Sequence, residues 1–347
     1  MKNDEINAMG TIRNSTSTLI VDGLCTSFFT QGGEAKAVND VSFSVGRGQI
    51  MGLVGESGSG KSMTGYSIMG LIDKPGKVIG GKVWLKGING TPVDLTTLSA
   101  TQMRQVRGNR ISMIFQDPMM TLNPVLRIDT QMIEAVLAHE NISKAEARER
   151  AREALVRVGI ASPDQRLESY PHQFSGGMRQ RVAIAIALLN KPDLIIADEP
   201  TTALDVTIQA QILYEMQKLC RESGTALIWI THDLSVVAGL ADTVCVMYAG
   251  KIVERGSVSQ VLESPHHPYT YGLMDSAPSR NVRGEPLRQI RGSTPSLINL
   301  PTGCSFRGRC DAEIDACVVA PVLRASADGH ACRCFNPCGA TAMEELI

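Results

Sequence analysis

A phosphate-loop sequence between a strand pattern and a helix pattern is the feature that most restricts how this chain folds. The segment GESGSGKS matches G-x-x-x-x-G-K-[ST], follows the apolar run QIMGLVG and precedes a helical pattern from Lys61 to Leu71. Glycines let backbone N–H groups point at a phosphate, and the helix N-terminus adds its positive end. The predicted phosphate-binding residues are Gly55, Glu56, Ser57, Gly58, Ser59, Gly60, Lys61 and Ser62.

Within this loop, Lys61 is expected to reach the β- and γ-phosphates of a nucleoside triphosphate, and the Ser62 hydroxyl to ligate Mg²⁺. The alternative is an ordinary glycine-rich turn that matches the motif by chance. The flanking strand and helix patterns argue against that alternative.

A second apolar run, Leu194 to Ala197, ends abruptly in two carboxylates, Asp198 and Glu199. Buried strands rarely end in paired charges without something to bind. Asp198 fits a carboxylate associated with Mg²⁺, and Glu199 fits a general base that polarises the attacking water. A solvated strand end is the alternative, and it explains one carboxylate better than two.

Apolar runs of strand length alternate with helical patterns from residue 18 to about residue 264, which predicts an α/β fold with a mostly parallel sheet. STLIVDGL and AVNDVSFSV predict two strands joined by a turn, and residues 130–159 predict helix. After about Pro265 the pattern becomes irregular. With 347 residues, 43% of them hydrophobic, the chain is long enough for about two domains with a sizeable core.

Charge and composition exclude several classes. The balance of 34 Lys and Arg against 35 Asp and Glu, with 4% aromatic residues, disfavours a nucleic-acid binder. The longest apolar run, Val182 to Leu189, is far below the ~18 residues of a membrane helix. The polar segment 1–17 lacks a secretion signal and is expected to be a disordered leader. We therefore expect a soluble, cytosolic protein whose membrane role goes through partners.

A second anion site is predicted at FSGGMRQR, where Ser175, Gly176 and Gly177 stand at the start of a helix. A hydroxyl and bare N–H groups at a helix N-terminus favour a phosphate. Two phosphate sites more than a hundred residues apart suggest that each triphosphate lies between two subunits.

At this point the sequence resembles the ATP-binding cassette (ABC) family, over Leu19 to about Glu263. The resemblance implies a P-loop NTPase (RecA-like) core with an antiparallel β subdomain, a helical signature subdomain at about 118–178, and the cofactors ATP and Mg²⁺. It implies that Gln116 senses Mg²⁺ and water, that the Ala203-Leu204-Asp205 segment crosses a dimer interface, and that His232 contacts the γ-phosphate. Phe28 aligns with the aromatic that stacks on adenine, although Phe28 or the adjacent Phe29 could instead belong to the core.

The signature departs from the commonest family form, with Phe174 in place of Leu and Met178 in place of Gln. A narrower resemblance to the ATPase subunits of dipeptide, oligopeptide and nickel importers comes from FQDPMMTLNPV, YPHQFSGGMRQRVAIAIALL, DEPTTALDVTIQAQIL and HPYTYGL. The form YPHQFSGGM resembles the D-type subunit. It implies a heterodimer with an F-type ATPase, two transmembrane permeases, an extracytoplasmic solute-binding protein, no nucleic acid, and a place on the cytoplasmic face of the inner membrane. Peptides are the favoured solute.

The alternatives are a nickel or other small-solute importer, a soluble non-transport ABC ATPase, or a metal-sensing regulator. Repair ATPases carry long coiled-coil insertions and translation ATPases fuse two cassettes, and neither feature is present. The complete set of hydrolysis residues argues against a primary sensing role.

The nine cysteines are unevenly placed. Cys25, Cys220 and Cys245 lie in apolar contexts and are expected to pack as small hydrophobes. Six others crowd the C-terminal extension, 265–347, which in a reducing compartment favours metal over disulfides. The resemblance implies a [4Fe–4S] cluster, with zinc or free thiols as alternatives. Its ligands would be Cys304, Cys310, Cys317 and Cys332, with Cys334 or Cys338 as possible substitutes, while His330 would be a helper or purely structural and not a ligand.

Overall fold

The computed structural model describes residues 17–87, 91–117, 121–201, 205–277, 281, 284, 286 and 288–338. The predicted leader therefore lies outside the described residues, apart from Ser17. The chain divides into two compact units that alternate along the sequence. The first unit is Met1–Leu19, Val45–Ile50 and Leu85–Trp229, and the second is Ile20–Ser44, Met51–Trp84 and Ile230–Ile347.

The second unit contains the predicted pair of N-terminal strands. β1 (Ser17–Thr30) and β2 (Gly33–Gly46) are joined by a two-residue turn, and β4 (Gly76–Leu85) lies on the other side of β1. In β2, Val41, Phe43 and Val45 are buried at every second position. This alternation is what a strand with one covered face requires.

The same unit holds a second group of strands. β3 (Ile50–Val54) pairs in parallel with β9 (Thr243–Tyr248), and β9 pairs antiparallel with β10 (Lys251–Ser257). Two short strands continue the sheet beyond β10: β12 (Ala331–Cys332) pairs with β10, and β11 (Arg324–Ala325) pairs with β12. The helices of this unit are α2 (Lys61–Met69), α9 (Leu234–Leu240), α10 (Val258–Glu263) and α11 (Pro268–Asp275).

The first unit combines parallel strands with a group of helices. β6 (Ile111–Ile114) and β7 (Leu194–Asp198) are parallel and fully buried, and β8 (Ala226–Thr231) follows at the boundary between the units. The short β5 (Val93–Asp94) and α3 (Ala100–Val106) precede β6. The helices that follow β6 are α4 (Ile128–Leu137), α5 (Lys144–Arg157), α6 (Pro163–Leu167), α7 (Gly176–Leu188) and α8 (Val206–Ser223).

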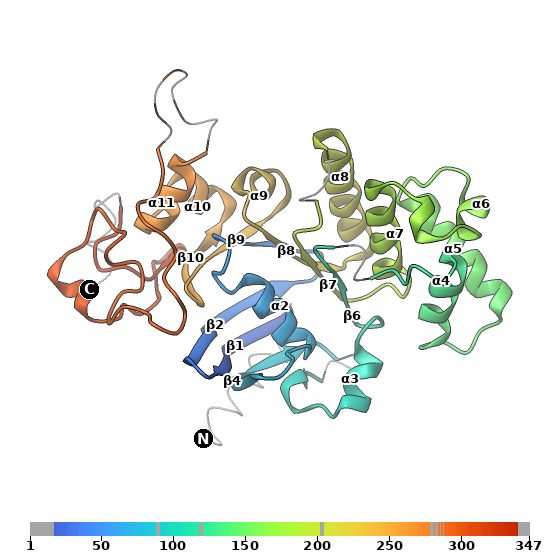
Figure 1. Ribbon diagram of the computed structural model, residues 1–347, viewed down its shortest axis with the longest axis horizontal. Helices are drawn as coiled ribbons and strands as arrows, with labels where there is room; N and C mark the ends of the chain where they lie inside the picture. The colour runs from blue at the N-terminus through green and yellow to red at the C-terminus, as the bar shows by residue number, and fades with distance from the viewer. Residues whose placement is uncertain are drawn as a thin grey trace. The chain divides into compact units, whose positions relative to one another are not determined.

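The helices α4, α5, α6 and α7 gather into one group within this unit (Figure 1). In α5, Ala147, Ala151, Ala154 and Leu155 are buried at i, i+4, i+7 and i+8, so one stripe of this otherwise charged helix faces its neighbours. The helical prediction for residues 130–159 is correct in kind. It misses the break between α4 and α5, where Ser143 caps the new helix by accepting the N–H of Glu146.

The segment after Pro265, predicted to be irregular, contains the helix α11. His267 caps it by accepting the N–H of Tyr269 through Nδ1, and Pro268 occupies the first turn. The cluster of buried residues in this unit includes Tyr248, Val253, Val261, Tyr269 and Phe306. The early part of the C-terminal extension is therefore packed, because its aromatic side chains enter a core.

Two of the three scattered cysteines are buried as predicted. Cys220 and Cys245 are at most 1% exposed, and burial raises the pKa of each thiol to about 12. Cys25 is only half-buried, and its Sγ accepts the N–H of Asp40. The prediction of a buried thiol is therefore wrong for Cys25.

The prediction of an iron–sulfur cluster is wrong. Over the described part of the chain, no three His, Cys, Asp or Glu side chains are grouped so that they could hold a metal ion. The predicted ligands Cys304, Cys310, Cys317 and Cys332 are free thiols. Burial raises the pKa of Cys332, and it raises the pKa of Cys334 to about 12.

No helix within the described residues combines the length and the apolar character needed to cross a bilayer.

Candidate functional site

The phosphate loop lies between β3 and α2, as the sequence predicts. Gly55 has φ +152°, and a Cβ there would lie 2.2 Å from the carbonyl oxygen of Met247. Gly60 has φ +104°, and a Cβ there would lie 2.2 Å from the carbonyl oxygen of Ala37. Both positions therefore require glycine, because the backbone is left-handed and approaches a neighbouring segment closely.

The side chain of Lys61 follows this loop. Its Nζ donates to the carbonyl oxygens of Gly55 at 2.8 Å and Glu56 at 3.0 Å, and the residue is buried. A tightly packed glycine loop with the Lys61 ammonium beside it is suited to binding a phosphate group. Gly250 also donates its N–H to Ser59 O at 2.9 Å, which fixes the loop from the β9–β10 turn.

A second group of predicted residues meets at the ends of β6 and β7. The two parallel strands run in register from Ile111 with Leu194 to Ile114 with Ala197. Gln116 lies two residues after the end of β6, and Glu199 directly follows β7. Gln116 Nε2 donates to Glu199 Oε2 at 3.3 Å. The carboxyl ends of parallel strands are where α/β proteins bind ligands, so this pairing follows from the topology.

Glu199 has φ +45°, in the left-handed region that non-glycine residues rarely adopt. Such a conformation costs on the order of 1–3 kcal/mol and is frequent at functional sites. The neighbouring Asp198 is 1% exposed at the end of its buried strand. The amide oxygen of Gln116 and the carboxylate of Asp198, both in the first unit, are hard oxygen donors of the type that Mg²⁺ prefers.

The predicted second anion site has the local geometry of a helix N-terminus. Ser175 is the N-cap of α7, and its Oγ accepts the N–H of Met178 at 3.3 Å. Ser175 and Gly176 are exposed, whereas Phe174 is buried beneath the guanidinium of Arg166. The unusual Phe174 therefore serves the core, and the serine and first glycine remain accessible.

The other predicted residues have simpler surroundings. Asp205 is the exposed N-cap of α8, and its Oδ1 accepts the N–H of Ile208; Ala203 and Leu204 lie outside the described residues. His232 is exposed directly after β8. Phe28 is half-buried, and its ring is close enough to Gly76 that a Cβ there would lie 2.7 Å from Phe28 Cε1, while Phe29 is exposed.

The phosphate loop and His232 belong to the second unit, and Gln116, Asp198, Glu199 and the Ser175 segment belong to the first. The structure brings together the loop residues around Lys61 and, separately, Gln116 and Glu199. One residue that the sequence reasoning missed is Tyr269, whose hydroxyl accepts the N–H of Glu56 at 2.8 Å. Its segment HPYTYGL is conspicuous in the sequence, but nothing in it indicates this partner 213 positions away.

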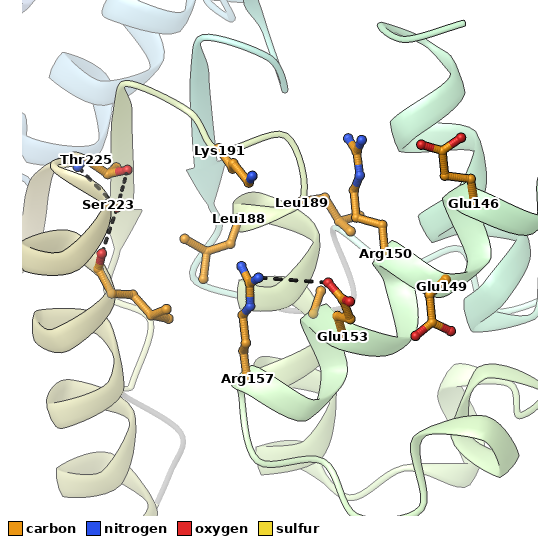
Figure 2. Close-up of a pocket in the computed structure, with 12 residues that line it drawn as sticks. Glu146, Glu149, Arg150, Glu153, Arg157, Leu188, Leu189, Lys191, Ser223 and Thr225 are labelled. Carbon is orange, nitrogen blue, oxygen red and sulfur yellow. Dashed lines mark hydrogen bonds and ion pairs between the residues drawn. The ribbon is translucent and has the colours of Figure 1, made fainter. Parts of the chain in front are cut away.

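A cavity of about 260 Å³ in the first unit contains none of the predicted site residues. It lies among α5, the end of α7 and the end of α8 (Figure 2). Glu153 and Arg157 face each other across one turn of α5 at 3.9 Å, and Ser223 Oγ bonds Thr225 Oγ1 at 2.8 Å. The cavity therefore does not coincide with the predicted site.

Comparison with known proteins adds independent findings. Residues 38–202 match the family model described as ABC transporter, and residues 253–317 match the model described as oligopeptide/dipeptide transporter, C-terminal region. The oligopeptide transport ATP-binding protein OppD of Escherichia coli is 45% identical, with 96% of each chain covered. The dipeptide transport ATP-binding protein DppD of Bacillus subtilis is 48% identical, over 91% of this chain and 94% of that protein.

Among solved structures, the dimeric post-hydrolysis state of the ATP-binding cassette MJ0796 bound to ADP and Pi is similar with a TM-score of 0.62. It is 26% identical and covers 69% of this chain and 98% of that one. The predicted α/β ATPase fold is therefore confirmed. The expected heterodimer is not supported, because none of these matches indicates pairing with a different ATPase.

Proposed function

Because the chain belongs to the ATP-binding cassette transporter family, in the branch of the oligopeptide and dipeptide transport ATPases, we propose that it is the ATP-hydrolysing subunit of a peptide importer. The single observation that carries this proposal is that both family models match one chain with near full-length similarity to peptide transport ATPases. Family membership implies membrane permeases as partners. We further propose two permeases and a solute-binding protein, with the chain held peripherally at the cytoplasmic face of the membrane.

In the proposed reaction, the backbone N–H groups of the loop and the Lys61 ammonium bind the β- and γ-phosphates. Bound Mg²⁺ would neutralise charge on the phosphates, and Ser62, Gln116 and Asp198 are the proposed oxygen donors toward it or its waters. Glu199 accepts the proton of the attacking water, and His232 contacts the γ-phosphate.

The adenine is proposed to stack on Phe28. Ser175, Gly176 and Gly177 are proposed to contact the nucleotide held by a second ATPase subunit, with Asp205 at the same interface. Residues 18–264 are proposed to form the ATPase domain and residues 265–347 the extension.

The test is reconstitution of the chain with its co-purified permeases and solute-binding protein in proteoliposomes. We expect ATP hydrolysis and uptake of trialanine to rise together when trialanine-loaded binding protein is added. Nickel chelates and disaccharides serve as control solutes. Stimulation by nickel and not by any peptide would contradict the proposed substrate class, and the co-purified subunits would distinguish a second copy of this chain from the F-type ATPase.

A further inference from the structure

A side chain from the C-terminal extension holds the phosphate loop. Arg309 forms a two-point ion pair with Glu56, the second residue of the loop, through Nη1 to Oε2 at 2.7 Å and Nη2 to Oε1 at 3.0 Å. Thr294 Oγ1 donates to the same Oε2 at 3.1 Å. Two-point pairing between a guanidinium and a carboxylate fixes orientation as well as charge.

Arg309 is itself held rigidly. Its Nε donates to the carbonyl oxygen of Arg291 at 2.8 Å, and its Nη1 reaches Tyr248 Oη at 3.3 Å. The guanidinium lies over the rings of Tyr248 and Phe306, at 5.7 and 5.8 Å from their centroids. The Arg309 side chain is only 8% exposed, so the surrounding core contacts fix its orientation independently of its pair with Glu56.

The contacts of Glu56 extend to the residues that bind nucleotide in the proposed function. Its N–H donates to Tyr269 Oη at 2.8 Å, while its carbonyl oxygen accepts Lys61 Nζ at 3.0 Å. The backbone at Glu56 is thus fixed on one side by the extension and touches the phosphate-binding lysine on the other. The hydrogen bond from Arg309 also holds the pKa of Glu56 below its ordinary value, so the carboxylate stays charged and paired.

We propose that Arg309, assisted by Tyr269, is a positioning residue for ATP binding: it neutralises Glu56 and fixes the loop in the conformation that receives the triphosphate. This inference rests on the proposed function, because it assigns the C-terminal extension a role in the same nucleotide site. Without Arg309, the carboxylate of Glu56 is unpaired within the loop that must accept a highly charged anion. Its negative charge then repels the triphosphate, and the affinity for ATP falls.

The test measures MgATP affinity of the full-length chain by titration calorimetry, and then KM and kcat in the reconstituted transporter. We expect Arg309→Met to raise Kd and KM for ATP by roughly tenfold, with kcat changed much less. Arg307→Met is the matched control, since Arg307 lies in the same region, pairs with Glu313 at 3.3 Å and donates to Thr302 O at 3.3 Å, and neither partner belongs to the phosphate loop. It should bind ATP like the wild type.

Two further variants separate positioning from folding. The double variant with Glu56→Gln and Arg309→Met should regain most of the affinity, because it removes the uncompensated charge. Tyr269→Phe keeps the buried ring and removes only the hydroxyl, and we expect a severalfold loss of affinity from it even if Arg309→Met does not fold.

Wild-type affinity in a folded Arg309→Met variant would overturn the inference, and so would wild-type affinity in Tyr269→Phe if Arg309→Met does not fold. So would an affinity loss in Arg309→Met that the added Glu56→Gln change leaves unaltered, since that loss would not arise from the pair. A wild-type chain that binds no ATP would instead refute the proposed function, so the two failures are distinguishable.

Discussion

Gln116 Nε2 lies 3.3 Å from Glu199 Oε2, although the two residues are 83 positions apart in the chain. The parallel pairing of β6 and β7 creates this contact by ending both strands at the same edge. The amide donates to the carboxylate that is proposed to accept the proton of the attacking water. Gln116 thereby orients the proposed base.

Glu199→Gln should abolish most hydrolysis and leave ATP binding intact. The amide keeps the size of the carboxylate but cannot accept a proton, so turnover should fall by about 10²–10⁴. With hydrolysis blocked, ATP should accumulate in a closed dimer that size-exclusion chromatography detects. Glu222→Gln, on the exposed end of α8, is the control. Near-normal turnover in Glu199→Gln would show that Glu199 is not the general base.

Lys61→Ala should weaken MgATP binding, because the buried ammonium that lies across the loop is lost. We expect at least a tenfold increase in Kd, about 1.4 kcal/mol, by titration calorimetry. Lys218→Ala removes an exposed lysine of α8 and should bind ATP normally. Equal affinity of the two variants would contradict the phosphate-loop interpretation.

Gly60→Ala should destabilise the chain as well as impair nucleotide binding. The new Cβ would lie 2.2 Å from Ala37 O at φ +104°. Backbone strain alone costs on the order of 1–3 kcal/mol, and the contact with Ala37 adds to it. Urea unfolding measures the change. Gly239→Ala, in α9 with nothing within 4 Å of the new Cβ, should be neutral or slightly stabilising; an equal loss in both would argue against the steric explanation.

Stability should fall as the pH drops from about 6.5 toward 4, and His267 should contribute to the loss. Burial lowers the pKa of His267 to about 4, so the unfolded chain binds a proton in this window that the folded chain does not. The full contribution of His267 to the free energy of unfolding is present above pH 6.5 and is on the order of 3 kcal/mol.

His267→Asn keeps a cap acceptor for Tyr269 N–H and removes the titration, so its free energy of unfolding should vary less between pH 6.5 and 4. Chemical denaturation at several pH values checks this result. The exposed His172→Asn is the control. An unchanged pH dependence in His267→Asn would show that other groups, such as the neighbouring His266 whose pKa burial also lowers, dominate the effect.

The local parts of the site follow from the sequence. Three features depend only on the backbone within a few residues, so a short sequence pattern specifies them. They are the glycines of the phosphate loop, the carboxylates at the end of a buried strand and the serine at the start of α7. The same applies to the alternation of β2 and to the buried stripe of α5. Chain periodicity and capping chemistry determine these features without reference to the rest of the fold.

Only the tertiary structure decided which residues the side chains of the C-terminal extension contact. Its cysteines suggested a metal cluster, but within the described residues no three His, Cys, Asp or Glu side chains are grouped so that they could hold a metal ion, and that grouping depends on packing that spacing does not encode. Arg309 and Glu56 are separated by 253 positions and belong to no common motif. Their contact arises because the aromatic core around Tyr248 and Phe306 places the guanidinium beside the phosphate loop, and such long-range pairing leaves no periodic signature in the chain.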